Sequence, residues 1–286
     1  MNDPSETRSG FFDFLRSTNV DHSGKASSYC RALDLLEQMI RAEPLGFDDC
    51  VNLWGVESIQ RLVDLRERVL AEQKRKAASP WVLKDVPASY LRDGFCSAAL
   101  TQLIEYLSER KYSQKVFGIL KDCQDDTIAA EKARKCKPMI PDTFVHDPKS
   151  KDGKERLQII KGRIGQNTFR QVILAIYRNR CCITGIDVPE VNRASHIVGW
   201  AERAETRMDP RNGLCLSATY DAAFDGKLIT FDDDYRLVLS KNIRDRVATE
   251  ALRTHFLSRE GQRIEMPQRF KPSRDYLEHH RTGGQF

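Results

Sequence analysis

Residues 169–229 read FRQVILAIYRNRCCITGIDVPEVNRASHIVGWAERAETRMDPRNGLCLSATYDAAFDGKLI, and this segment is the most informative about the C-terminal part of the chain. Within it, the short apolar segment ASHIVGW predicts a strand that carries His196. The segment RMDPRNGL predicts a turn at Asn212, which a glycine follows. In TYDAAFDGKLI, Asp221 and Asp225 are four residues apart, so they share one face of a predicted short helix.

These residue types suit the hydrolysis of a phosphodiester. The reaction needs an activated water and a cation that neutralises charge on the phosphate. His196 is the candidate general base, because its ordinary pKa lies near working pH. Asp221 is the candidate metal ligand, since carboxylate and amide oxygens favour Mg²⁺ or Mn²⁺. Asn212 either adds an amide oxygen to the metal or ties its loop so that His196 is correctly aimed.

A purely structural interpretation exists for each residue. His196 would be a satisfied strand histidine, Asn212 part of an ordinary turn, and Asp221 the N-cap of a helix. For any one residue alone this interpretation is preferable. The three in this order and spacing favour a catalytic site.

Four short segments carry a resemblance to a known family. They are CCITG at 181–185, SHI at 195–197, RNGL at 211–214 and DAAFD at 221–225. Together they resemble the HNH endonuclease family, in particular the branch of bacterial restriction-type nucleases, over roughly residues 160–286.

The resemblance implies a ββα-metal fold, a β-hairpin and a helix that hold one divalent cation. His196 matches the first histidine of the family motif and would be the base, Asn212 matches the asparagine, and Asp221 takes the position of the last histidine. The implied metal ligands are Asp221, Asn212 and Asp225. The chain departs from the pattern at Asp221 and at Ser195, which stands where many members have an acidic or histidine ligand. The implied cofactor is therefore Mg²⁺ or Mn²⁺ held by a small ligand set.

Arginines beside the motif are candidates to hold the substrate phosphate, because guanidinium groups pair well with its oxygens. They are Arg193, Arg207 and Arg211. The implied substrate is DNA, cut to leave 5′-phosphate ends. A single site cuts one strand, so double-strand cleavage would need a homodimer or two successive nicks. The family also implies a role in restriction and defence against foreign DNA.

The composition of the 286 residues is that of a globular protein with a small basic excess, at a formal net charge of +5. Such an excess suits a polyanionic partner without requiring one. The chain has no apolar run long enough for a membrane span and no signal-peptide pattern at its start, so we expect a cytoplasmic protein. The eight cysteines are scattered and no secretion signal is seen, so reduced thiols are expected. None of them forms a C-x-x-C pair, which argues against a structural zinc site. Zinc binding by Cys181, Cys182 and Cys215 is an alternative to ordinary buried cysteines.

The predicted fold class is α+β, with an N-terminal all-helical domain and a C-terminal ββα-metal nuclease domain. Residues 1–125 show amphipathic helical periods and form the helical domain, which would bind DNA or dimerise. Its basic patch at Lys74, Arg75 and Lys76 is a candidate DNA contact. Residues 126–165 are rich in lysine and proline, which predicts a basic linker or an extended arm along phosphates. Residues 166–286 form the nuclease domain.

The region after the motif predicts a hairpin at residues 228–240, with an acidic turn at 232–234, a helix at 242–257 and a closing helix near the end. His279 and His280 are interpreted as tail residues rather than ligands, and His146 as an exposed residue without a role.

Two other functions remain open at this level. One is a non-catalytic DNA-binding or regulatory protein on a degenerate HNH scaffold, favoured by Ser195 at a ligand position. The other is an RNA-directed nuclease, because the metal chemistry does not distinguish the two sugars.

Overall fold

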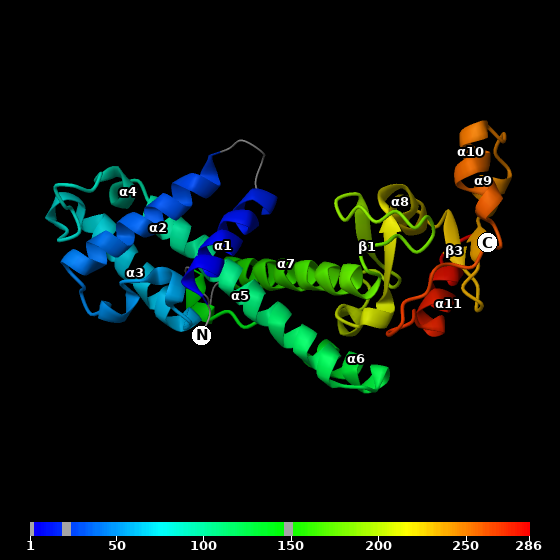
Figure 1. The fold of residues 1–286 in the computed structure, drawn as a ribbon, viewed down its shortest axis with the longest axis horizontal. Coiled ribbons are helices and arrows are strands. Elements are labelled where there is room, and N and C mark those ends of the chain that lie inside the picture. The colour runs from blue at the N-terminus through cyan, green and yellow to red at the C-terminus, as the bar shows by residue number, and fades with distance from the viewer. Residues whose placement is uncertain (1–2, 19–23, 146–150) are drawn as a thin grey trace. The chain divides into compact units, whose positions relative to one another are not determined.

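The computed structural model describes residues 3–18, 24–145 and 151–286 (Figure 1). The chain forms two compact units: Met1–Lys111 with Met139–Lys161, and Tyr112–Pro138 with Gly162–Phe286. Two long helices, α5 (Phe95–Asp122) and α7 (Lys151–Ile176), each contribute residues to both units. The limits of these units differ from the domain boundaries expected at residues 125 and 165. Those boundaries concern parts of the chain that fold independently, and they stay a prediction.

The first unit is helical, as its periodicity predicts. It contains α1 (Pro4–Thr18), α2 (Lys25–Ala42), α3 (Ile59–Arg75), α4 (Ser89–Arg92) and the first part of α5, with short 3₁₀ turns at Asp48–Cys50, Leu53–Gly55, Lys76–Ala78 and Asp142–Phe144. The side chain of Ser58 caps α3 by accepting a hydrogen bond from the amide of Arg61. The core includes the fully buried Trp81, whose indole N–H donates to the carbonyl of Glu43 at 2.7 Å.

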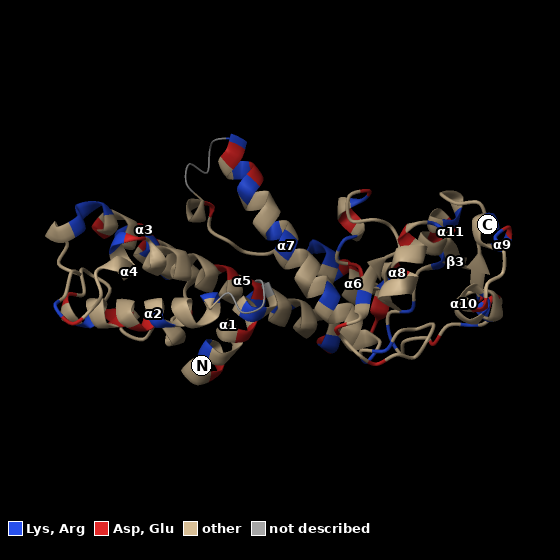
Figure 2. Ribbon diagram, turned by 90° about the horizontal axis from the view of Figure 1, so that it is seen from above, with Lys and Arg blue, Asp and Glu red and all other residues tan. Residues whose placement is uncertain are grey.

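Residues 126–165 are largely helical, and the expected extended conformation is wrong for α6 (Asp126–Lys135) and for the start of α7. The carboxylate of Asp125 caps α6 by accepting from the amides of Thr127 and Ile128. In α7, Leu157, Ile160 and Ile164 are buried at helical spacing among many charged residues. Figure 2 shows basic and acidic residues interspersed along this part of α7. The high lysine content made the helical spacing of these apolar residues difficult to recognise in the sequence. His146 lies outside the described residues.

The second unit is built around a pair of antiparallel strands, β1 (Asn192–His196) and β2 (Gly213–Ser217), in which His196 lies opposite Gly213. Helix α8 (Ala218–Asp225) follows β2 directly and packs against both strands (Figure 1). The expected helix with Asp221 and Asp225 is therefore confirmed. A strand carrying His196 is also present, but it ends at His196, so the rest of the expected segment, residues 197–200, is not part of it. The loop from β1 to β2 carries 3₁₀ turns at Ala204–Thr206 and Pro210–Asn212.

Gly213 is needed at the start of β2 because α7 packs closely against it. A Cβ atom at this position would lie 2.3 Å from Cδ1 of Ile173 and 2.8 Å from Cζ of Phe169. The absence of a side chain therefore lets α7 support the beginning of the strand pair.

The predicted hairpin after α8 is also present, as β3 (Ile229–Phe231) and β4 (Leu237–Leu239). The single helix expected at 242–257 is wrong. Two short helices, α9 (Lys241–Arg244) and α10 (Glu250–His255), replace it, because the hydroxyl of Thr249 caps a new helix by accepting from the amide of Leu252. A 3₁₀ turn at Leu257–Arg259 and helix α11 (Arg274–Thr282) complete the chain.

All eight cysteines are free thiols, and seven of them are buried. Across the ranges 3–18, 24–145 and 151–286, none of the helices has the length and apolar character needed to cross a membrane.

Candidate active site

His196 ends β1 and is held on three sides. Its ring stacks on Phe169 at a centroid distance of 3.7 Å and meets the edge of Trp200 at 5.4 Å. Its Nε2 lies 3.1 Å from the carbonyl oxygen of Arg207. A carbonyl oxygen only accepts hydrogen bonds, so Nε2 carries the proton and donates. Nδ1 is then the ring nitrogen with a lone pair.

Burial keeps this ring neutral. Desolvation lowers the pKa of His196 from 6.5 to about 4, and the positive charge of Arg207 acts in the same direction, while the hydrogen bond to the carbonyl of Arg207 opposes both. At neutral pH the imidazole is therefore uncharged and able to accept a proton at Nδ1.

Two carboxylates project from α8 near this ring. The hydroxyl of the buried Ser195 donates to Oδ1 of Asp221 at 2.5 Å, so β1 orients the first carboxylate. Desolvation raises the pKa of Asp225, the charge of Asp221 raises it further, and Lys227 opposes the change. The two carboxylates, four residues apart on α8, form a local concentration of negative charge.

These groups line one pocket of about 630 Å³. His196 lies on its wall with Asp221 and Asp225, so the structure brings these three residues together. Its other charged lining residues are Arg170, Arg193, Glu202 and Lys227. The pocket combines a neutral base, three carboxylates and three cations.

Asn212 is fully buried and has a different place from the other motif residues. Its Oδ1 accepts from the amide of Val198 at 2.8 Å, and its Nδ2 donates to the carbonyls of Val198 and Thr206. The amide therefore fixes the chain that follows His196. The sequence leaves two roles open for Asn212, a metal ligand or a residue that holds the loop after His196. These hydrogen bonds match the second role.

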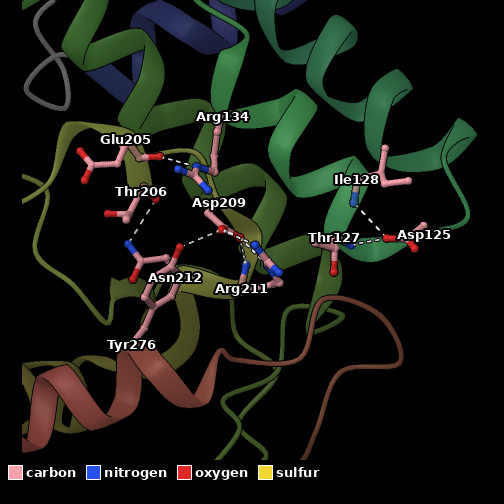
Figure 3. Close-up of polar contacts among 10 residues, drawn as sticks. All are labelled: Asp125, Thr127, Ile128, Arg134, Glu205, Thr206, Asp209, Arg211, Asn212 and Tyr276. Carbon is pink, nitrogen blue, oxygen red and sulfur yellow. Dashed lines mark hydrogen bonds and ion pairs between the residues drawn. The ribbon is translucent and has the colours of Figure 1, made fainter.

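The side chains of Arg211 and Arg207 both form hydrogen bonds within the protein. The fully buried carboxylate of Asp209 accepts two hydrogen bonds from the guanidinium of Arg211 and one from the hydroxyl of Tyr276 at 3.0 Å (Figure 3). This contact raises the pKa of Arg211 above its usual value. Arg207 donates from Nε to the carbonyl of Trp200 at 2.7 Å and lies over its ring. Of the three arginines predicted to hold phosphate, the pocket is lined by Arg193.

Residues 181–232 match the family model described as HNH endonuclease. The chain contains an HNH endonuclease family domain. The matched segment holds β1, β2 and α8 and is shorter than the region expected from the resemblance. Comparison with curated proteins found no match to the chain.

The HNH segment alone does not complete the pocket. Phe169 and Arg170 come from α7, and His280 comes from α11. Arg170 donates to the carbonyls of Asn192 and Pro189, at 2.7 and 2.8 Å, and so ties α7 to the approach to β1.

His280 is the clearest residue that sequence reasoning misplaced. It is buried rather than in a free tail, stacks on Phe224 at 3.8 Å, and contacts Oγ1 of Thr230 at 2.9 Å and the carbonyl of Phe224 at 3.1 Å. Desolvation lowers its pKa to about 4. The available signal was helical spacing, because Leu277 and His280 are three residues apart on one face of α11.

The donor set of the pocket fits a hydrated hard cation. In the part of the chain that the structure describes, no three side chains of His, Cys, Asp or Glu are grouped to hold a metal, and Cys181, Cys182 and Cys215 form no such group. Mg²⁺ keeps several waters and is commonly bound through one or two carboxylates and the substrate phosphate. Asp221 and Asp225 provide such a pair, whereas a closed zinc cage would need more donors.

Lys74, Arg75 and Lys76 lie in the first unit, at the end of α3 and the start of the next 3₁₀ turn. All three are exposed, and Arg75 pairs with the buried Glu72 at 3.2 Å.

Proposed function

We propose that the second unit is a divalent-metal-dependent endonuclease that hydrolyses DNA phosphodiester bonds, with β1, β2 and α8 as its ββα-metal element. The observation that carries this proposal is a neutral His196, with its Nδ1 lone pair, in one pocket with Asp221 and Asp225. The match to the HNH endonuclease model supports it.

His196 is the general base of the proposed reaction. Its Nδ1 takes a proton from the attacking water, and its Nε2–H keeps the ring oriented through the carbonyl of Arg207. The imidazolium that forms retains this hydrogen bond. Asn212 forms hydrogen bonds with the backbone of Val198 and Thr206 in the loop between β1 and β2, so it positions the base.

Asp221 and Asp225 are the proposed ligands of Mg²⁺ or Mn²⁺. The bound cation would neutralise charge on the phosphate and on the departing oxygen. The hydrogen bond from Ser195 keeps Asp221 in a fixed orientation, and Arg193 at the pocket wall is placed to pair with a phosphate oxygen.

A single pocket of this kind acts on one strand at a time. Cleavage of both strands would then take a homodimer or two successive nicks, and a restriction or defence role is the setting that the family suggests. The small donor set specifically favours one competing function, DNA binding without turnover.

The proposal is tested with supercoiled plasmid at low salt, in Mg²⁺, in Mn²⁺ and in chelator, with wild type, Asp221→Asn and Asp225→Asn. We expect nicking only with metal. Each substitution should raise the metal concentration for half-maximal cleavage by about tenfold or more, since even loss of an outer partner of a ligand has effects of this size. Ser195→Ala should cause a smaller shift in the same direction.

Asp234→Asn is the matched control, because Asp234 is an exposed aspartate at the β3–β4 turn, outside the pocket. It should cleave as wild type does. Plasmid binding without cleavage in either metal, by protein shown to be folded, would favour the non-catalytic function instead. Preference for an RNA over a DNA substrate would change the substrate class.

A further inference from the structure

The end of α8 has an unusual residue at its last turn. The amide of Leu228 donates to the carbonyl of Ala223 at 2.8 Å, and the amide of Lys227 donates to the carbonyl of Phe224 at 3.0 Å. This pair of bonds is the Schellman ending of a helix, and it puts Lys227 in the left-handed region at φ 53°. Glycine is preferred at this position because it has no Cβ, yet the glycine at the end of α8 is one residue earlier, at 226.

The position of the Lys227 side chain is also energetically unfavourable, because it is partly desolvated. It is partly buried and lines the pocket that contains His196 and Asp221. Its charge acts on Asp225 and Glu202, but among the described residues no carboxylate oxygen lies within the 4.0 Å of an ion pair with its ammonium. A cation that is partly removed from water without a close partner lowers stability.

The other two cations of the pocket donate hydrogen bonds to backbone carbonyls, Arg193 through its Nη1. Arg170 donates to the carbonyls of Asn192 and Pro189, and Arg193 donates from Nη1 to the carbonyls of Glu190 and Asn192. Among the described residues, the ammonium of Lys227 thus has no hydrogen-bond or ion-pair partner, although the side chain lines the pocket.

We propose that Lys227 is a phosphate-binding residue, whose ammonium pairs with a backbone phosphate of the nucleic acid bound in the pocket. The ligand chemistry is that of a phosphodiester anion, for which lysine acts as a point charge. This inference rests on the proposed function in one respect, that nucleic acid occupies this pocket.

The chain provides a matched control at the end of α7. The amide of Arg178 donates to the carbonyl of Ala175 and the amide of Asn179 to the carbonyl of Leu174, so Arg178 occupies the same position of the same helix ending, at φ 54°. Arg178 is exposed and does not line the pocket. Replacement of either residue by glycine removes one positive charge and relieves the same backbone strain.

The experiment compares Lys227→Gly with Arg178→Gly in the full-length protein. Thermal unfolding should show that each variant is at least as stable as wild type, with a midpoint raised by about 2 °C. Binding to a 30-base-pair duplex in chelator is then measured over a series of salt concentrations. Lys227→Gly should bind about tenfold more weakly at low salt. The slope of log affinity against log salt should decrease in magnitude by about 0.9, the value for one phosphate contact.

Arg178→Gly should bind as wild type does, and Lys227→Arg should retain most of the affinity and slope. Equal slopes for wild type and Lys227→Gly would overturn the inference, and so would a loss of stability in Lys227→Gly that accounts for the weaker binding. Because binding is measured in chelator, a wild-type protein that binds DNA through Lys227 but never cuts it would contradict the proposed nuclease activity and leave this inference standing.

Discussion

Two groups of polar residues in the second unit differ in how far their hydrogen bonds are satisfied. In the loop between β1 and β2, Arg211 donates hydrogen bonds to Asp209, and the side-chain amide of Asn212 bonds to the backbone (Figure 3). Both Asp209 and Asn212 are fully buried. At the pocket, Asp225 and Lys227 have no ion pair between them, and each has a charge that its environment disfavours. The bonded group thus fixes the loop between β1 and β2, whereas the charges of Asp225 and Lys227 face the pocket.

The largest expected effect concerns the base. His196→Gln should lower the rate of metal-dependent cleavage by about 10² to 10⁴-fold, the usual contribution of general acid–base catalysis, and leave DNA affinity nearly unchanged. Single-turnover cleavage and binding in chelator measure the two quantities. A loss of binding equal to the loss of cleavage would place His196 with the fold-building group instead.

The next effect concerns the buried ion pair. Asp209→Ala should lower the free energy of unfolding by about 3 kcal/mol or more, because it leaves the partly buried Arg211 without its partner. Denaturant unfolding measures the change. Asp233→Ala is the control, since Asp233 pairs with Arg281 at 2.7 Å but is exposed, and its loss should cost under about 1 kcal/mol. Equal effects of the two substitutions would remove the distinction between buried and exposed groups.

The smallest effect is a pH dependence. His280 has a pKa of about 4 in the folded protein against 6.5 in the unfolded chain, so between these values the unfolded state binds more protons. Its contribution to stability is complete above pH 6.5 and is lost as the pH falls towards 4, by at most about 3 kcal/mol. His280→Phe keeps a ring against Phe224 and should reduce this slope. Unfolding of wild type and variant at pH 4.5 and 7.5 measures it, and an unchanged slope would assign the pH dependence to other groups.

The sequence predicted the strand, the helix and the hairpin of the second unit well, because their signals are local. Asp221 and Asp225 share a face of α8 through their spacing alone, and the alternation of residues 228–240 fixed the β3–β4 hairpin. The helices of residues 126–165 were missed because charged residues obscure their apolar period. Arg211 was assigned to phosphate because its residue type suits that role, whereas its guanidinium pairs with the carboxylate of Asp209, two residues earlier, which Tyr276 buries from a distant part of the chain.

The sequence alone indicates the HNH motif, the order of its elements and residue types that suit phosphodiester hydrolysis, since these depend on neighbours within a few positions. The tertiary structure decided which of those residues reach the pocket. Burial between Phe169 and Trp200 sets the charge state of His196, and the backbone ending of α8 directs Lys227 into the same space. Desolvation and hydrogen-bond satisfaction depend on segments distant in the chain, so no local pattern encodes them.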